Sequence, residues 1–114
     1  MKLLIVEDNP SVRRVIRNIV ATVADDVYEC EDGADALPAY VAHKPDCVLM
    51  DIAMKNVDGI TATKLIRDRY PDSKIIIVTN FDETDLRESA LQAGACGYVL
   101  KENLLELRRL LQDM

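Results

Sequence analysis

Histidine and cysteine are scarce in this chain, which has one histidine, His43, and three cysteines among its 114 residues. The cysteines stand far apart, without the short spacing of a zinc site, and a single histidine adds only one further ligand. Their odd number also argues against a disulfide framework. We therefore expect Cys30, Cys47 and Cys96 to be free thiols buried in the protein.

Long hydrophobic runs are absent as well. No stretch approaches the roughly 18 apolar residues that a membrane-spanning helix needs. The first apolar run, Leu3–Val6, is too short for a signal peptide and is followed at once by two acidic residues. The sequence therefore predicts a cytoplasmic protein with no membrane segment.

Positive charge is in the minority, with 14 Lys and Arg against 20 Asp and Glu and a formal net charge of −6. A nucleic-acid-binding face needs clustered Lys and Arg, so we expect no direct nucleic acid binding by this domain. The excess of acids suits a domain that gathers carboxylates around a cation. With 49% hydrophobic and 30% charged residues, the composition is globular, and the length predicts one domain over residues 1–114.

Short apolar runs alternate with helical patterns along the chain. The apolar runs predict buried strands at Leu3–Val6, Val27–Glu31, Cys47–Met50, Lys74–Val78 and Gly97–Leu100. Apolar spacing and capping residues predict helices over about 10–23, 34–43, 60–70, 83–93 and 103–114. Strands that are apolar throughout and alternate with helices favour an α/β fold, with a parallel sheet covered on both faces.

Three local signals refine the helices. Asp82 is placed to cap the fourth helix, and Gly94 to end it. Pro38 is compatible with the second helix only if that helix starts near Asp35, because proline is tolerated in the first turn.

Polar side chains follow the ends of four predicted strands. Glu7 and Asp8 follow the first strand, Asp51 the third, Thr79 the fourth and Lys101 the fifth. Because ligands of open parallel sheets bind at the carboxyl ends of the strands, we expect these side chains to share one pocket. Each residue alone is most simply read as a helix cap, a strand former or a solvated charge, but the combination favours a site.

Three carboxylates in one pocket repel one another. Two unit charges about 5 Å apart cost about 3 kcal/mol at an effective dielectric constant near 20. Either the pKa values of the acids rise or a cation binds among them. Carboxylate oxygens in small number suit Mg²⁺, which then shares its coordination with phosphate. An ammonium and a hydroxyl beside the ion could neutralise and orient a phosphoryl group, so the sequence predicts phosphoryl chemistry with Mg²⁺.

At these residues the sequence closely resembles the receiver domain of two-component response regulators. The matching stretches are Leu3–Asn9, Val48–Gly59, Ile75–Asn80 and Ala90–Lys101. The last two look most like receivers of the LuxR/NarL-type subfamily, which often precede a DNA-binding domain. The resemblance covers the whole chain and implies a flavodoxin-like, doubly wound sheet of strand order 2-1-3-4-5 with five helices. It also implies a signalling switch that catalyses only its own phosphorylation and dephosphorylation.

The resemblance implies a role for each matching pocket residue. Asp51 would accept a phosphoryl group from a phosphohistidine on a sensor histidine kinase or a phosphotransfer protein. Asp8, Asp51 and the backbone carbonyl of Ala53 would bind Mg²⁺ directly, and Glu7 would act through water. Lys101 would contact the phosphoryl group.

Two further residues would act as a switch. The Thr79 hydroxyl would turn toward the phosphoryl group, and Tyr98 would follow by changing rotamer. The surface formed by helix 83–93, strand 97–100 and helix 103–114 would then change and control an effector, and a homodimer could form through it. If a DNA-binding domain follows, the regulated process would be transcription. The chain departs from the common pattern at Lys55 and Glu102, where many receivers have proline, and at Asn80, where a smaller residue is common.

Two other interpretations use the same residues. A Mg²⁺-dependent phosphohydrolase would also need an acid two residues after its aspartyl nucleophile, where this chain has Ala53. A receiver fold that acts as an interaction domain without phosphorylation remains the other. Arg13, Arg14 and Arg17 are expected on the solvent side of helix 10–23, where they are either solvated or dock an acidic kinase surface.

Overall fold

The computed structural model describes residues 1–114 as five strands alternating with five α-helices. The strands are β1 (Lys2–Val6), β2 (Asp26–Cys30), β3 (Cys47–Met50), β4 (Ile75–Thr79) and β5 (Gly97–Leu100). The helices are α1 (Pro10–Val20), α2 (Ala36–His43), α3 (Gly59–Arg69), α4 (Thr84–Ala93) and α5 (Glu106–Gln112), with short 3₁₀ turns at Gly33–Asp35 and Lys101–Asn103.

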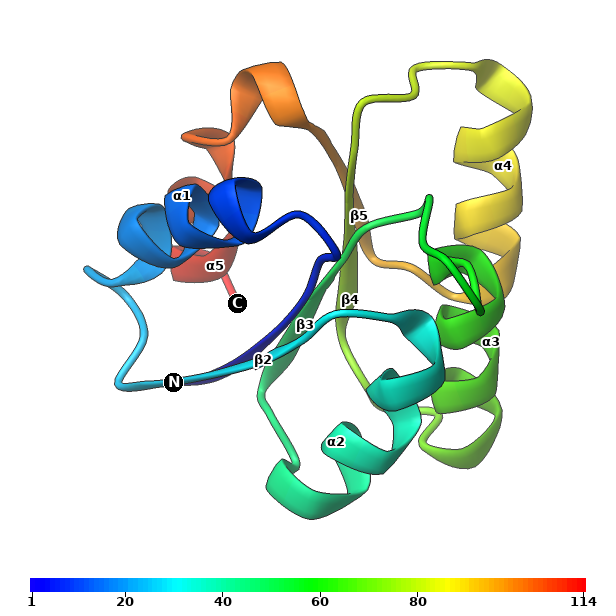
Figure 1. Ribbon diagram of the computed structural model, residues 1–114, viewed down its shortest axis with the longest axis horizontal. Helices are drawn as coiled ribbons and strands as arrows, with labels where there is room; N and C mark the ends of the chain where they lie inside the picture. The colour runs from blue at the N-terminus through cyan, green and yellow to red at the C-terminus, as the bar shows by residue number, and fades with distance from the viewer.

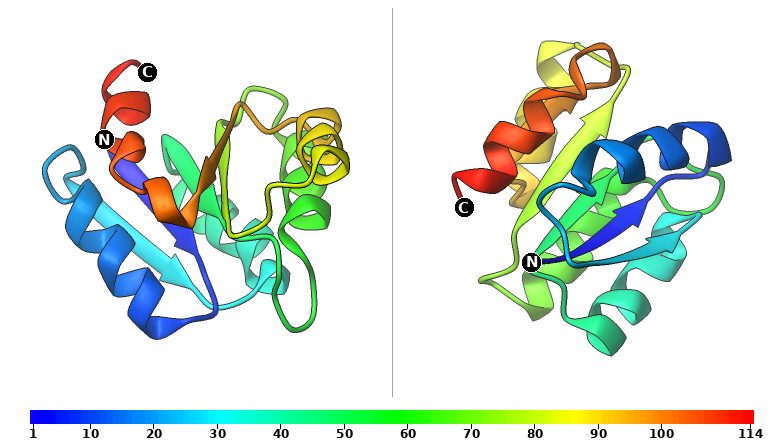
Figure 2. Two further views of the ribbon diagram at one scale, coloured as in Figure 1. Left: turned by 90° about the horizontal axis from the view of Figure 1, so that it is seen from above. Right: turned by 90° about the vertical axis from the view of Figure 1, so that its left-hand side faces the viewer.

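All five strands are parallel and lie in the order β2-β1-β3-β4-β5. Helices α1 and α5 cover one face of the sheet, and α2, α3 and α4 cover the other (Figure 1). The two turned views in Figure 2 show the same three layers. The α/β class, the strand order and the five helices predicted from the sequence are confirmed.

The hydrophobic core is split by the sheet into two clusters. Successive strand residues point to opposite faces, so Leu4, Val6 and Met50 pack toward α2–α4, while Leu3, Ile5 and Leu49 pack toward α1 and α5. Because both faces are covered, every residue of β3 and β4 is buried. Continuous apolar runs were therefore the correct signal for the central strands. The prediction of full burial was wrong for the edge strands β2 and β5, which have a neighbouring strand on one side only and are partly exposed.

Several predicted details were wrong at the ends of helices. Helix α1 ends at Val20, and Ala21–Val23 form a turn. Helix α5 begins only at Glu106, after the 3₁₀ turn that starts at Lys101. Asp82 does not cap α4, because Glu83 occupies the N-cap position, and the Asp82 carboxylate accepts hydrogen bonds from Arg87.

Two other predictions on the helices are confirmed, and the prediction of buried cysteines is confirmed in part. Pro38 lies in the first turn of α2, where no helical hydrogen bond is lost. Gly94 ends α4 with a φ of 107°, in the left-handed region that favours glycine. Cys30 and Cys47 are buried free thiols, but Cys96 is exposed, contrary to prediction, because it lies in the turn before β5.

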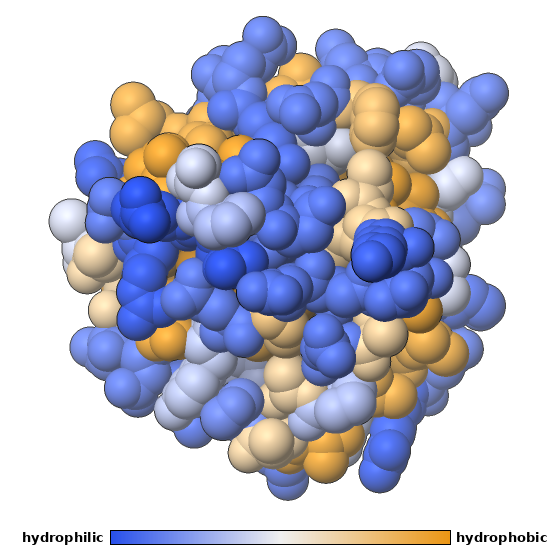
Figure 3. Space-filling model, in the orientation of Figure 1, coloured by the Kyte–Doolittle hydropathy of each residue, from blue (hydrophilic) through white to orange (hydrophobic).

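The surface is largely hydrophilic, as Figure 3 shows for one face, with hydrophobic atoms gathered mainly over the α3–α4 side and above α1. No helix of the chain is both long and apolar enough to span a membrane, since the longest have 11 residues.

Candidate functional site

A cavity of about 250 Å³ lies at the carboxyl ends of the strands. It is lined by all the residues that the sequence placed there, Glu7, Asp8, Asp51, Ala53, Thr79 and Lys101, together with Asn9, Val12, Asn80 and Phe81. Larger grooves exist elsewhere on the surface, but only this one holds the acidic cluster.

The three carboxylates form a compact cluster. One oxygen from each of Glu7, Asp8 and Asp51 lies within 4.8 Å of the others. Glu7 and Asp51 are buried, whereas Asp8 is exposed. The Lys101 ammonium lies between the two buried acids, with Nζ 2.8 Å from Glu7 Oε1 and 3.2 Å from Asp51 Oδ1.

Burial raises the pKa values of two acids in this cluster. Desolvation raises the pKa of Glu7 to about 7, even though Lys101 and the backbone N–H of Asn9 favour the charged form. Desolvation also raises the pKa of Asp51, again against the influence of Lys101. One ammonium therefore does not compensate the acids fully. A divalent cation bound to the same oxygens would lower both pKa values, so the donor set fits a hard metal ion.

The loop after β1 is held by α1. Asn9 caps the helix, its side-chain oxygen accepting hydrogen bonds from the N–H groups of Ser11 and Val12, while its own N–H donates to Glu7 Oε2. The Arg13 guanidinium donates to the backbone oxygen of Glu7 at 2.7 Å. The geometry thus ties the end of β1 to the first turn of α1.

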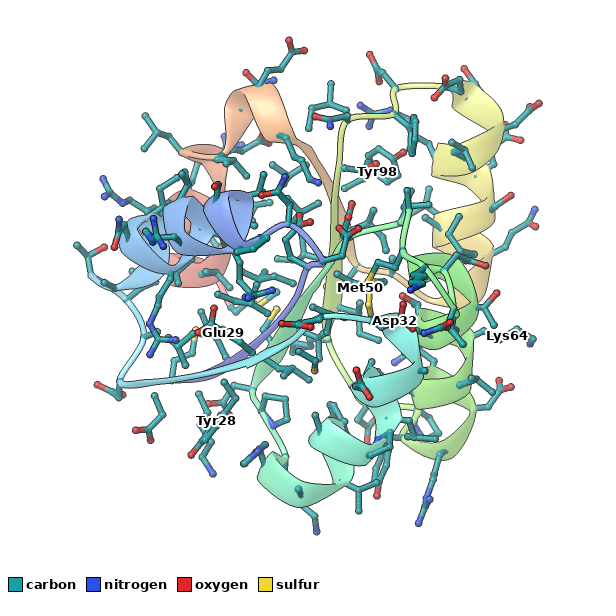
Figure 4. The ribbon with its side chains drawn as sticks, viewed as in Figure 1. Tyr28, Glu29, Asp32, Met50, Lys64 and Tyr98 are labelled. Carbon is teal, nitrogen blue, oxygen red and sulfur yellow. The ribbon has the colours of Figure 1, made fainter.

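Arg13 is not the solvent-facing residue that the sequence predicted. Its side chain is 15% exposed and pairs with Glu29, the residue labelled beside α1 in Figure 4. Arg14 and Arg17 are exposed, as predicted. Helical spacing puts all three arginines on one broad face, and only the position of Glu29 on β2 reveals that Arg13 turns toward the sheet.

Asp51 is held by the backbone around it. Its N–H donates to the oxygen of Val6 at 2.9 Å, and its Oδ1 accepts from the N–H of Ile52 at 2.9 Å. The start of α3 packs directly behind, because a Cβ on Gly59 would lie 1.8 Å from the backbone oxygen of Asp51. The backbone of Asp51, the candidate phosphoryl acceptor, is therefore closely held on several sides.

Thr79 and Tyr98 make no hydrogen bond to each other, but the hydroxyl of each is hydrogen-bonded to the backbone of Phe81. The Thr79 hydroxyl accepts from the Phe81 N–H at 3.1 Å, and the Tyr98 hydroxyl donates to the Phe81 oxygen at 2.6 Å. Tyr98 lies outside the cavity, between β5 and α4, as Figure 4 shows, and the Arg87 guanidinium lies 4.5 Å from its ring centre.

The family follows from comparison with known proteins. Residues 3–112 match the model of the response regulator receiver domain. The chain belongs to the receiver domains of two-component response regulators, as the sequence motifs indicated.

Individual relatives agree with this assignment. The chain is 40% identical over 104 residues, 90% of its length and 49% of the relative's, to the uncharacterized transcriptional regulatory protein YhcZ of Bacillus subtilis. It is 37% identical over 101 residues, 88% of its length and 84% of the relative's, to the chemotaxis protein CheY of Bacillus subtilis.

Solved structures give the same result. A LuxR-family DNA-binding response regulator from Staphylococcus aureus superposes with a TM-score of 0.89 at 28% identity, covering 98% of this chain and 96% of that one. The chain spans about half the length of the first curated transcriptional regulators that it matches.

Proposed function

We propose that Asp51 accepts a phosphoryl group in a Mg²⁺-dependent reaction and that the chain acts as a phosphorylation-driven switch. The observation that carries the proposal is the position of Lys101, whose ammonium contacts both buried acids within one cavity. A phosphorylatable carboxylate needs an adjacent cation on one side and a metal-binding acid pair on the other, and this cavity supplies both.

The metal would be held by Asp8, Asp51 and the backbone oxygen of Ala53, with Glu7 supporting it through water. Bound Mg²⁺ would supply positive charge against the phosphoryl oxygens. An Asp51 oxygen would attack the phosphorus of a phosphohistidine, forming the O–P bond while the N–P bond breaks. The released imidazole nitrogen then takes up a proton, and Lys101 neutralises charge on the transferred group.

The switch would run through Phe81. When the Thr79 hydroxyl turns toward the phosphoryl group, it gives up the hydrogen bond from the Phe81 N–H. The same residue's carbonyl accepts from Tyr98, so a movement of Phe81 changes the support of the tyrosine hydroxyl. Phosphorylation would in this way shift the balance between two arrangements of the α4–β5–α5 surface.

The phosphoryl donor would be a sensor histidine kinase or a phosphotransfer protein. The effector would read the α4–β5–α5 surface, and a homodimer could form through it. Leu105, 66% exposed in the segment before α5, offers an apolar contact next to this surface. Several of the matched relatives are transcriptional regulators, which supports transcription as the controlled process where a DNA-binding domain follows.

Phosphorylation without a kinase is the direct test. The chain is incubated with Mg²⁺ and acetyl phosphate, and its mass is measured. We expect a mass gain of one phosphoryl group. Loss of this gain in acid and on treatment with hydroxylamine would identify it as an acyl phosphate. Asp51→Asn should abolish the gain, and Lys101→Ala should slow it. No gain in the parent chain, or a gain that persists in Asp51→Asn, would contradict the proposal and favour a phosphorylation-independent interaction domain.

A further inference from the structure

The Asp32 carboxylate joins two loops that are far apart in sequence. Asp32 follows β2 and is only 7% exposed. Its Oδ2 accepts from the backbone N–H of Ala34 at 2.8 Å and of Val57 at 3.1 Å, and its Oδ1 accepts from the N–H of Asn56 at 2.9 Å. In Figure 4 it lies between the start of the α2 region and the loop that leads into α3.

The backbones of the two loops also pack without space between them. A Cβ on Gly33, the residue after Asp32, would lie 2.2 Å from the backbone oxygen of Val57. The absence of a side chain at Gly33 therefore lets the β3–α3 loop approach closely enough for both of its N–H groups to reach one carboxylate. The hydrogen bonds from Ala34 and Asn56 lower the pKa of Asp32, so the carboxylate stays charged in this position.

The loop that Asp32 holds carries part of the candidate site. It begins at Asp51 and passes through Ala53, which lines the acidic cavity. No hydrogen bond of the structure involves Ala53 or Met54, so the backbone hydrogen bonds that hold this stretch lie at its two ends, while the Met54 side chain packs against the core. At one end, the Gly59 N–H donates to the Ile52 oxygen at 2.8 Å. At the other end, Asn56 and Val57 are held by Asp32.

We propose that Asp32 is a positioning residue for the metal site, because it fixes the β3–α3 loop and thereby keeps the backbone of Ala53 beside Asp8 and Asp51. This inference rests on the proposed function, since it takes the acidic cavity to bind Mg²⁺. Asp32 itself touches neither the metal ligands nor the phosphoryl group. Its influence passes through the loop backbone, as the influence of residues that orient metal ligands generally does.

The test compares Mg²⁺ binding by four chains: the parent, Asp32→Ala, Asp32→Asn and Asp35→Ala. Asp35 is the matched control, because its exposed side chain carries the same charge three residues away and makes no capping hydrogen bond. Mg²⁺ affinity is measured by following pocket amide signals in NMR spectra during titration. We expect Asp32→Ala to raise the Mg²⁺ Kd about tenfold and Asp35→Ala to leave it unchanged.

Asp32→Asn should give an intermediate Kd. The amide keeps one acceptor oxygen, but its NH₂ group faces a backbone N–H that the carboxylate had satisfied. In both Asp32 variants the Asn56 and Val57 amides should exchange faster with solvent. With acetyl phosphate as donor, the Mg²⁺ concentration for half-maximal phosphorylation should rise by the same factor as the Kd, while the rate at saturating Mg²⁺ stays near that of the parent.

A residue that contributed only to stability would lower the melting temperature without moving the Mg²⁺ dependence. The inference is overturned if the folded Asp32 variants bind Mg²⁺ with the parent's Kd, or if Asp35→Ala weakens binding equally. If Asp32→Ala does not fold, Asp32→Asn is judged by the same criteria. Failure of the proposed function looks different, because the parent chain itself would then bind no Mg²⁺ or accept no phosphoryl group.

Discussion

The two halves of the candidate site are built differently. On the β1–β3 side, Glu7 and Asp51 are buried and their loops are tied to the protein by Arg13, Asn9, Asp32 and the start of α3. On the β4–β5 side, Thr79 is buried as well, but its hydroxyl and that of Tyr98 each make one hydrogen bond, both to Phe81, in a loop whose residues 80–83 are exposed. We call the first the braced half, because several side chains hold its loops, and the second the switch side, because fewer side-chain hydrogen bonds hold its loop.

The largest effect is expected from a substitution that introduces a side chain against the backbone of Asp51 in the braced half. Gly59→Ala would bring a Cβ to 1.8 Å from the backbone oxygen of Asp51, and backbone does not yield easily. We expect a loss of about 3 kcal/mol or more in the free energy of unfolding, measured by urea denaturation, together with loss of phosphorylation.

Gly97→Ala on β5 is the matched control for that substitution. The three atoms nearest to its new Cβ all belong to the Ile76 side chain, the first at 3.3 Å. The loss should stay below about 1 kcal/mol, and phosphorylation should continue. Equal losses in the two variants would show that the halves do not differ in rigidity.

The charge balance of the braced half predicts a pH dependence. Without metal, the pKa of Glu7 is raised to about 7 in the folded chain. The folded state therefore binds this proton more tightly than the unfolded state, so its contribution is present at low pH and is lost as pH rises through about 7. Between pH 5.5 and 8, melting experiments in a chelator should show a loss of roughly 1–3 kcal/mol.

Adding Mg²⁺ should reverse this loss, most strongly at pH 8, where the carboxylates are charged. Glu7→Gln removes the titrating group and should flatten the pH dependence of the metal-free chain. A parent chain as stable at pH 8 as at pH 5.5 in chelator, matching Glu7→Gln throughout, would mean that burial does not perturb the acids as described.

Arg13 and Arg17 offer a sharper comparison within one helix. Both pair with Glu29, at 3.1 Å and 2.6 Å respectively, but only Arg13 also binds the backbone oxygen of Glu7 and has a mostly buried side chain. Arg13→Ala should cost about 1–2 kcal/mol of stability and weaken Mg²⁺ binding. Arg17→Ala should cost less than about 0.5 kcal/mol, because exposed ion pairs contribute little. Thermal melting and Mg²⁺ titration of the two variants would decide the matter, and an equal cost would count against a role of Arg13 at the site.

The smallest effect is expected on the switch side. Tyr98→Phe removes the hydrogen bond to the Phe81 oxygen and should cost about 0.5 kcal/mol. The amides of residues 80–83 should exchange faster with solvent, while Mg²⁺ affinity stays unchanged. Tyr28→Phe is the control, because the Tyr28 hydroxyl makes no hydrogen bond and its ring is stacked on His43. A Tyr98→Phe variant with altered Mg²⁺ affinity would argue that the halves are not separable.

Much of the fold could be predicted because local pattern and global architecture agree. Cys47–Met50 is apolar throughout and is a fully buried strand. Gly94 ends α4 and Pro38 lies in the first turn of α2, the positions that their backbone preferences predict. The predicted end of α1 was wrong because apolar residues continue past the last helical residue. The predicted start of α5 was wrong because apolar residues precede the first one. Helix ends depend on local hydrogen bonds that periodicity does not report.

The cavity residues were predictable for a different reason. Parallel strands end at a common edge, so residues far apart in the chain are brought together by topology alone. This accounts for Glu7, Asp8, Asp51, Thr79 and Lys101. It says nothing of Asp32, which is not at the end of a central strand, or of Arg13, which was predicted to face solvent. Their contacts depend on how closely two loops approach and on which rotamer the packing allows.

The sequence by itself determined the sheet and the chemical groups at its edge, because hydrophobic spacing and strand direction act locally and repeat along the chain. Only the tertiary structure decided which of those groups are held rigidly, because Asp32 meets Asn56 and Arg13 meets Glu29 across distances in sequence that no periodic pattern spans. It likewise placed Thr79 and Tyr98 on the same residue, Phe81, since that meeting depends on the path of one exposed loop.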